Sequence, residues 1–169
     1  MNETTTAAST DRVSIRRDLT ETHAAYVELV GQIGDAHWKQ RSGNPAWTCG
    51  QLAWHIPTSM AFQIGQIESA KKKGNGLNLP PFLMPVLYKV SELRVKVASR
   101  KATPSSVLAD FDAGMTRLLA LLEATDDASL MTNAKSLGET RTIAGMFQVP
   151  VEHFAEHAAD VRKVLGSMA

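Results

Sequence analysis

Two histidines lie four residues apart near the C-terminal end of the sequence, in the segment V-P-V-E-H-F-A-E-H-A-A-D. On a helix, residues four positions apart point in directions that differ by only about 40°, so His153 and His157 could bind the same metal ion. The alternative is a pair of partly buried histidines that bond to neighbouring carboxylates, such as Asp160. This motif alone does not decide between the two interpretations.

A third histidine, His55, lies about a hundred residues earlier, in the segment W-T-C-G-Q-L-A-W-H-I. It shares a helix face with Leu52, Ile56 and Ser59, so we expect its side chain to point inward as well. A third imidazole directed toward the interior favours a metal site over two unrelated histidines.

The pattern W-[ST]-x6-H-[IL], which runs from Trp47 to Ile56, followed by the later H-x-x-x-H, resembles the DinB/YfiT-like superfamily of small four-helix bundles. Members of that superfamily bind a divalent metal through one histidine of the second helix and two of the last helix. The resemblance therefore implies that His55, His153 and His157 are metal ligands. It also implies a relation to thiol-dependent enzymes that use mycothiol, bacillithiol or glutathione, among them maleylpyruvate isomerases and S-transferases.

Three neutral imidazoles would leave a divalent ion its full charge and at least one open position, which suits catalysis better than a closed structural site does. Zinc or nickel is favoured by imidazole ligands, with iron and manganese as alternatives. We expect either a thiol S-transferase or isomerase, with a low-molecular-weight thiol as cosubstrate, or a hydrolase that uses metal-bound hydroxide. The competing hypothesis is a non-catalytic stress protein that binds a metal or a small ligand.

Glu156 lies inside the histidine motif, so that H-F-A-E-H also matches the H-x-x-E-H signature of inverzincin metalloproteases. Those enzymes resemble large α/β proteins with a further Glu ligand downstream, whereas only 12 residues follow His157. We keep Glu156 as a candidate general base. The favoured alternative is that Glu156 is a solvated carboxylate or one that only supports a ligand, because its side chain points about 100° away from that of His157 around the helix. A di-iron carboxylate site is excluded, since the sequence contains no Glu-x-x-His.

The elements that must position these residues are helices, because apolar residues recur at three- and four-residue intervals and no segment alternates strictly. We predict an all-α four-helix bundle whose long crossover contains an extra helix, in a single domain of residues 11–169 after a disordered tail of residues 1–10. The expected helices are 11–34, 48–73, 104–124 and 142–165, with the crossover helix in 82–100 and mostly loop in 125–138.

Two prolines and a capping signal refine this pattern in the histidine-bearing helices. Thr48 and Gln51 match a capping box at the start of the second helix. Pro57 has no N–H for the carbonyl of residue 53, and Pro150 has none for that of residue 146, so each helix should bend there. Trp54, more than Trp47, is the candidate wall of a ligand pocket, although core packing is the favoured alternative for both.

Composition restricts the partners. Eighteen basic and seventeen acidic side chains give a net charge of +1, which offers no general attraction for nucleic acid. The single cysteine excludes a Cys-based zinc site. A polar start and the absence of a long apolar run predict a cytoplasmic protein without a membrane partner. We expect it to act on a small molecule, either as a monomer or as a homodimer. The crossover is locally basic. Its cations form either a solvated helix face or a basic rim that attracts an anionic substrate to the metal site; they are Lys89, Arg94, Lys96, Arg100 and Lys101.

Overall fold

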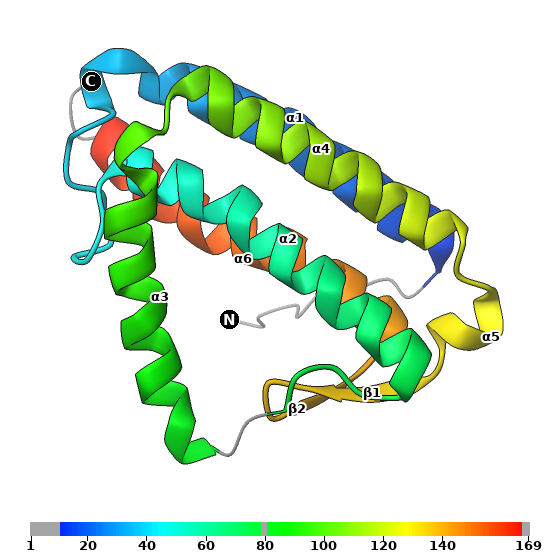
Figure 1. Ribbon diagram of the computed structural model, residues 1–169. Coiled ribbons are helices and arrows are strands. Elements are labelled where there is room, and N and C mark those ends of the chain that lie inside the picture. The colour runs from blue at the N-terminus through cyan, green and yellow to red at the C-terminus, as the bar shows by residue number, and fades with distance from the viewer. Residues whose placement is uncertain (1–10, 79–80, 167–169) are drawn as a thin grey trace, which may run out of the picture.

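Four long helices form the bundle in the computed structural model, which describes residues 11–78 and 81–166 (Figure 1). They are α1 (Arg12–His37), α2 (Cys49–Lys73), α4 (Pro104–Glu123) and α6 (Ile143–Leu165). α1 and α2 each pack against both α4 and α6, so the four helices surround one core. The predicted all-α four-helix bundle is confirmed, and the tail predicted for residues 1–10 lies outside the described residues.

The helix starts follow the capping signals of the sequence. Thr48 accepts a hydrogen bond from the Gln51 backbone N–H, and the Gln51 side chain accepts one from the Thr48 N–H, which is the predicted capping box. Thr103 forms a second capping box with Ser106 at the start of α4, and the Thr142 side chain accepts a hydrogen bond from the Gly145 N–H at the start of α6. Because each cap satisfies backbone donors that have no partner inside the helix, these threonines fix where the helices begin.

α1 runs one turn further than the sequence predicts. Gly34, the expected end, has a left-handed φ of 47° inside the helix, and helical structure resumes and continues to His37. Glycine adopts this conformation without the steric cost of a side chain, so the residue makes a kink instead of a terminus.

The crossover contains the predicted extra helix, α3 (Met84–Ala98), between the short 3-10 segments Pro81–Leu83 and Ser99–Lys101. α3 lies outside the bundle, and its N-terminal end stands well away from α2 (Figure 1). Val95 is its one buried residue within the described part of the chain. α3 is therefore helical without being part of the main core.

Part of the segment expected to be loop is a short β-hairpin, preceded by the one-turn helix α5 (Asp127–Leu130). β1 (Asn133–Ser136) pairs antiparallel with β2 (Glu139–Thr142). The two turn residues, Leu137 and Gly138, have φ values of 51° and 87°. Positive φ at both positions matches the twist of a tight hairpin turn, but this turn usually contains Asn-Gly, so Leu-Gly gives no signal in the sequence.

Both prolines lie inside continuous helices, Pro57 in α2 and Pro150 in α6, and the bend expected at each remains a prediction. The carbonyl of Ala53, which Pro57 leaves without a helical donor, accepts a hydrogen bond of 2.8 Å from the Tyr26 hydroxyl. Tyr26 is fully buried and its ring stacks on Phe111 at a centroid distance of 3.9 Å. A side chain of α1 thus replaces the missing backbone donor in the turn of α2 that contains His55.

No helix in the described residues has both the length and the apolar character needed to cross a bilayer.

Candidate metal centre

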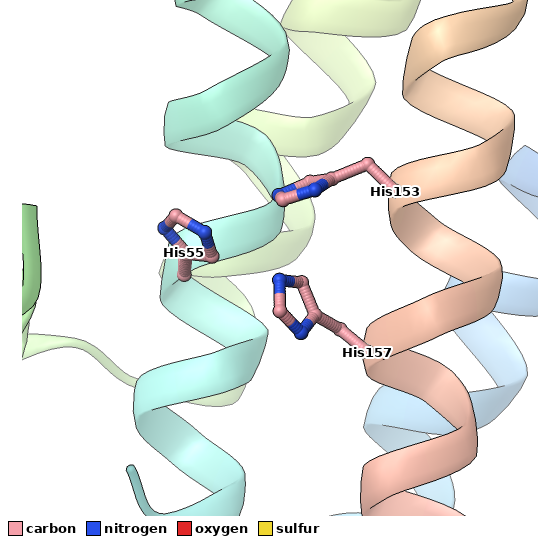
Figure 2. Close-up of side chains that lie close together, drawn as sticks. All are labelled: His55, His153 and His157. Atoms are coloured by element: carbon pink, nitrogen blue, oxygen red, sulfur yellow. The ribbon is translucent and has the colours of Figure 1, made fainter. Parts of the chain in front are cut away.

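The three histidines come together between two neighbouring helices, His55 on α2 and His153 and His157 on α6 (Figure 2). One ring nitrogen from each can be chosen so that all three lie within 4.8 Å of one another. The ring centroid of His55 lies 5.0 Å from that of His153 and 5.1 Å from that of His157. The ring centroids of His153 and His157 are 4.5 Å apart. The structure therefore brings together all three residues that the sequence indicates as ligands, although His55 lies about a hundred residues before the other two.

The interior of this cluster contains polar atoms that lack partners. His157 is buried, His55 and His153 are half-buried, and His153 Nε2 and His157 Nδ1 are fully covered without a hydrogen bond among the described residues. A buried polar atom without a partner costs about 1–3 kcal/mol, so such atoms call for an explanation. A divalent ion held by one nitrogen of each imidazole would give His153 Nε2 a partner, whereas His157 Nδ1 faces Asp160, whose Oδ2 lies 4.0 Å away. The donor set of three nitrogens suits zinc or nickel.

Burial keeps the three imidazoles neutral. It is the main cause that lowers the pKa of His55 to about 3, and the nearby His153, His157 and Arg94 add to the effect. The pKa of His153 is lowered to about 4 by burial and then by His157. Burial also lowers the pKa of His157, although the charges of Glu156 and Asp160 oppose it. At neutral pH each ring therefore offers a free lone pair, which metal binding requires.

One wall of the cluster is Trp47, in the loop between α1 and α2. Its ring centroid lies 4.7 Å from that of His55 and 5.9 Å from that of His157. Its indole Nε1 is buried without a partner in the described residues. The sequence favours Trp54 for this role, but among the described residues Trp47 is the tryptophan whose ring contacts the histidines. Both tryptophans are half-buried and also pack against the hydrophobic core.

A backbone hydrogen bond holds this loop against α6, and a side-chain hydrogen bond within the loop supports it. The Gly43 N–H donates to the Asp160 carbonyl at 2.8 Å, and the Ser42 hydroxyl donates to the Trp47 carbonyl at 2.9 Å. A Cβ at Gly43 would come within 2.9 Å of the Asp160 carbonyl oxygen, so only glycine allows this approach. The sequence interpretation missed the loop as part of the site; the Gly43 of R-S-G-N-P was the available signal.

The two acidic candidates near the histidines lie at the edge of the cluster. Asp160 Oδ2 is 4.0 Å from His157 Nδ1, too far for a hydrogen bond, whereas Lys163 Nζ donates to Asp160 Oδ1 at 3.1 Å. Among the described residues, Asp160 therefore pairs with Lys163 and not with His157. Glu156 is exposed and is not among the residues that converge, so its role as a base remains a prediction.

The one cysteine and the other two histidines of the sequence lie apart from the site. Cys49 is completely buried in the first turn of α2, and burial raises the pKa of its thiol, which makes it a poor nucleophile. His23 lies on the surface, where its Nε2 is 2.6 Å from Asp112 Oδ1, and His37 Nδ1 is 3.0 Å from the Ile33 carbonyl oxygen at the end of α1. Neither of these histidines belongs to the cluster.

Comparisons with known proteins match the sequence to one superfamily and the fold to two solved structures. Residues 18–161 match the sequence model of the DinB superfamily. No protein with a curated description matches the sequence significantly. Among solved structures, YfiT from Bacillus subtilis, described as a probable metal-dependent hydrolase with an unusual four-helix bundle topology, superposes with a TM-score of 0.72 at 17% identity. That match covers 99% of this chain and 93% of YfiT.

A second solved structure has the same fold over a smaller share of its length. The mycothiol-dependent maleylpyruvate isomerase superposes with a TM-score of 0.68 at 12% identity, covering 89% of this chain and 60% of the isomerase. This chain therefore spans only about three fifths of that enzyme. At these identities both matches show the shared fold.

Proposed function

Since the chain belongs to the DinB superfamily, we propose that it is a divalent-metal-dependent enzyme acting on a small molecule, with His55, His153 and His157 as the metal ligands. The observation that carries the proposal is the convergence of three neutral imidazoles with no carboxylate among them. A structural zinc site would be closed by a fourth protein ligand, and the described residues place none beside these three.

The residues around the cluster prepare it for this task. α2 and α6 hold the imidazoles at fixed separations, and burial keeps protons from competing for the ring nitrogens at neutral pH. The Trp47 ring covers one side of the cluster and excludes water there. A divalent ion in this position would lower the pKa of a bound water or thiol and make it a nucleophile at neutral pH.

We infer that the nucleophile comes from outside the chain. The only cysteine, Cys49, is buried and its thiol pKa is raised, so it cannot supply a thiolate. Two reactions meet this condition. Transfer or isomerisation with a low-molecular-weight thiol as cosubstrate is supported by the fold shared with the mycothiol-dependent isomerase, and hydrolysis by water is supported by the fold shared with YfiT over nearly the full length of both chains.

Metal analysis of purified protein tests the ligand set. We expect one equivalent of zinc or nickel in the wild-type protein and its loss in His55→Ala and His153→Ala. His23→Ala is the matched control, because this surface histidine pairs with Asp112 away from the cluster and its loss should leave the metal content unchanged. Stoichiometric metal in both cluster variants would refute the proposed site.

An activity screen then separates the two reactions. Metal-loaded protein is incubated with model electrophiles in the presence of mycothiol, bacillithiol or glutathione, and with activated esters and amides in the absence of any thiol. Turnover that needs a thiol assigns the transferase or isomerase class, and turnover without a thiol assigns the hydrolase class. Turnover that survives loss of all three histidines would refute a metal mechanism, while no turnover under any condition would favour the non-catalytic binding protein.

A further inference from the structure

α3 presents an apolar stripe to solvent on the side that faces away from the bundle. Its members recur at intervals of four, three and four residues and are between 49% and 64% exposed: Val86, Val90, Leu93 and Val97. At 100° per residue they fall within about 60° of one another around the helix. Val95, which is 2% exposed, points roughly 170° away from the centre of the stripe. One side of α3 thus packs toward the bundle at Val95, although Tyr88 on the same side is 66% exposed, while the described residues leave the apolar stripe uncovered.

The spacing of the stripe is that of a coiled-coil seam. Val90 and Val97 take a positions of a heptad, and Val86 and Leu93 take d positions. A shallow hollow of about 430 Å³ lies along the N-terminal part of this seam; it is lined by Pro85, Val86, Lys89, Val90 and Leu93. A stripe limited to a and d positions is narrower than the apolar face that a helix buries in a protein core, and such a seam fits one partner helix.

Cations flank the seam on both sides. Lys89 and Lys96 take the g positions on one side and Arg94 takes the e position on the other. Both lysines pair with Glu92, at 3.3 Å and 2.6 Å, and the sequence has no other acidic residue between positions 82 and 101. The g side therefore carries two lysines that share one carboxylate, and the e side carries Arg94 after the uncharged Leu87. The net flanking charge is positive, and the Arg94 charge also acts on His55.

This charge pattern selects the occupant. A second copy of α3 would place lysines beside arginines in a parallel pairing, and lysines beside lysines in an antiparallel one, so like charges would meet in both orientations. We propose that α3 is a docking surface for an amphipathic helix of a partner protein whose apolar seam is flanked by Glu and Asp. Because α3 is already helical as part of the folded chain, only the partner has to become ordered on binding.

The test uses the full chain and two synthetic 28-residue peptides as probes. Both peptides have Val at a and Leu at d positions; one has Glu at every e and g position and the other has Lys. Fluorescence anisotropy of the labelled peptides should show binding of the acidic peptide with a Kd on the order of ten micromolar. Each favourable flanking pair contributes about twofold, so the three cations should make binding of the Lys peptide at least roughly eightfold weaker.

Substitutions on the seam show where the peptide binds. Val90→Glu and Leu93→Glu place charges at exposed positions, so both variants should fold as the wild type does and lose the acidic peptide. Val27→Glu is the matched control, because Val27 is an exposed apolar residue on α1, and it should bind unchanged. Circular dichroism checks the fold of all three variants.

The other possible occupants are distinguished in the same experiment. Sedimentation velocity that shows a dimer dispersed by Leu93→Glu would assign the seam to a second copy and overturn the proposal. Binding to phosphatidylserine-containing vesicles without binding of the acidic peptide would assign it to a lipid surface, which also overturns it. Equal affinity for the two peptides, or no affinity for either, refutes the charge-selected seam.

Discussion

Tyr26→Phe should destabilise the protein through a carbonyl that Pro57 leaves without a donor. The Tyr26 hydroxyl donates to the Ala53 carbonyl at 2.8 Å, and the substitution removes this donor while keeping the ring that stacks on Phe111. A buried acceptor left without a partner costs about 1–3 kcal/mol. Because Tyr26 is fully buried, we expect a loss near the middle of this range, about 2 kcal/mol, which lowers the Tm by roughly 4–8 °C in a chain of this size.

A double-mutant cycle tests the cause of this loss. Pro57→Ala restores a backbone N–H four residues after Ala53, so the helix itself can then donate to the carbonyl. In that background Tyr26→Phe should cost about 1 kcal/mol less than in the wild type. The free energies of unfolding come from urea titrations of metal-free protein. An equal cost of Tyr26→Phe in both backgrounds would refute the view that Tyr26 replaces the missing helical donor.

The same carbonyl lies half a turn before His55, which gives the cycle a second readout. If Tyr26 holds this turn of α2 in place, Tyr26→Phe should also weaken metal binding, and Pro57→Ala should restore part of the affinity. Competition with a chromophoric chelator measures both effects. Unchanged affinity in Tyr26→Phe would limit the role of Tyr26 to stability.

Three further predictions concern the cluster and its loop. The folded pKa values of His55 and His153, about 3 and about 4, lie below the ordinary value of 6.5, so the unfolded chain binds protons first as the pH falls. Urea titrations should therefore show that metal-free protein keeps its free energy of unfolding above about pH 6.5 and loses at most about 2 kcal/mol per histidine by pH 5. A free energy of unfolding that does not change between these pH values would contradict the burial of neutral rings. Nickel should quench tryptophan fluorescence strongly in the wild type and weakly in Trp47→Phe, because Trp47 is the indole beside the cluster; equal quenching would place the ion elsewhere. Gly43→Ala should destabilise the protein by about 1–3 kcal/mol in thermal melts because its Cβ would overlap α6, whereas Gly65→Ala, with open space around it, should stabilise slightly; similar effects of both changes would show that the loop does not press on α6.

Local rules predict the helices and the histidine pair because these depend on neighbours in the sequence. Thr48 and Gln51 form the expected capping box, and the four-residue spacing of His153 and His157 places both rings on one side of α6. The position of His55 beside them depends on the packing of α2 against α6 and cannot be obtained from spacing. The resemblance to a known superfamily supplied that contact at the level of the sequence.

The sequence did not predict the contacts of the loop between α1 and α2, or the β-hairpin, because both depend on distant parts of the chain. Trp47 contacts His157 because Gly43 allows the loop to approach α6, and a single glycine among several polar residues does not indicate its neighbour. Leu137 adopts a left-handed conformation that is rare for its residue type, and the contacts of the hairpin support it: the Leu137 N–H donates to the Leu77 carbonyl at 2.7 Å. In both places tertiary contacts override the local preference that a sequence pattern reports.

α3 shows the limit of periodicity most clearly. The recurrence of apolar residues predicts a helix over residues 82–100, and the structure confirms the helix but leaves Val90 and Leu93 exposed. Periodicity reports that a face is apolar and does not report whether its cover is the same chain or another molecule. The charges beside the face carry the missing information, since cations along both edges disfavour a copy of the same helix and favour an acidic one. An unpartnered apolar face in a folded chain is therefore evidence about a partner once its flanking charges are included.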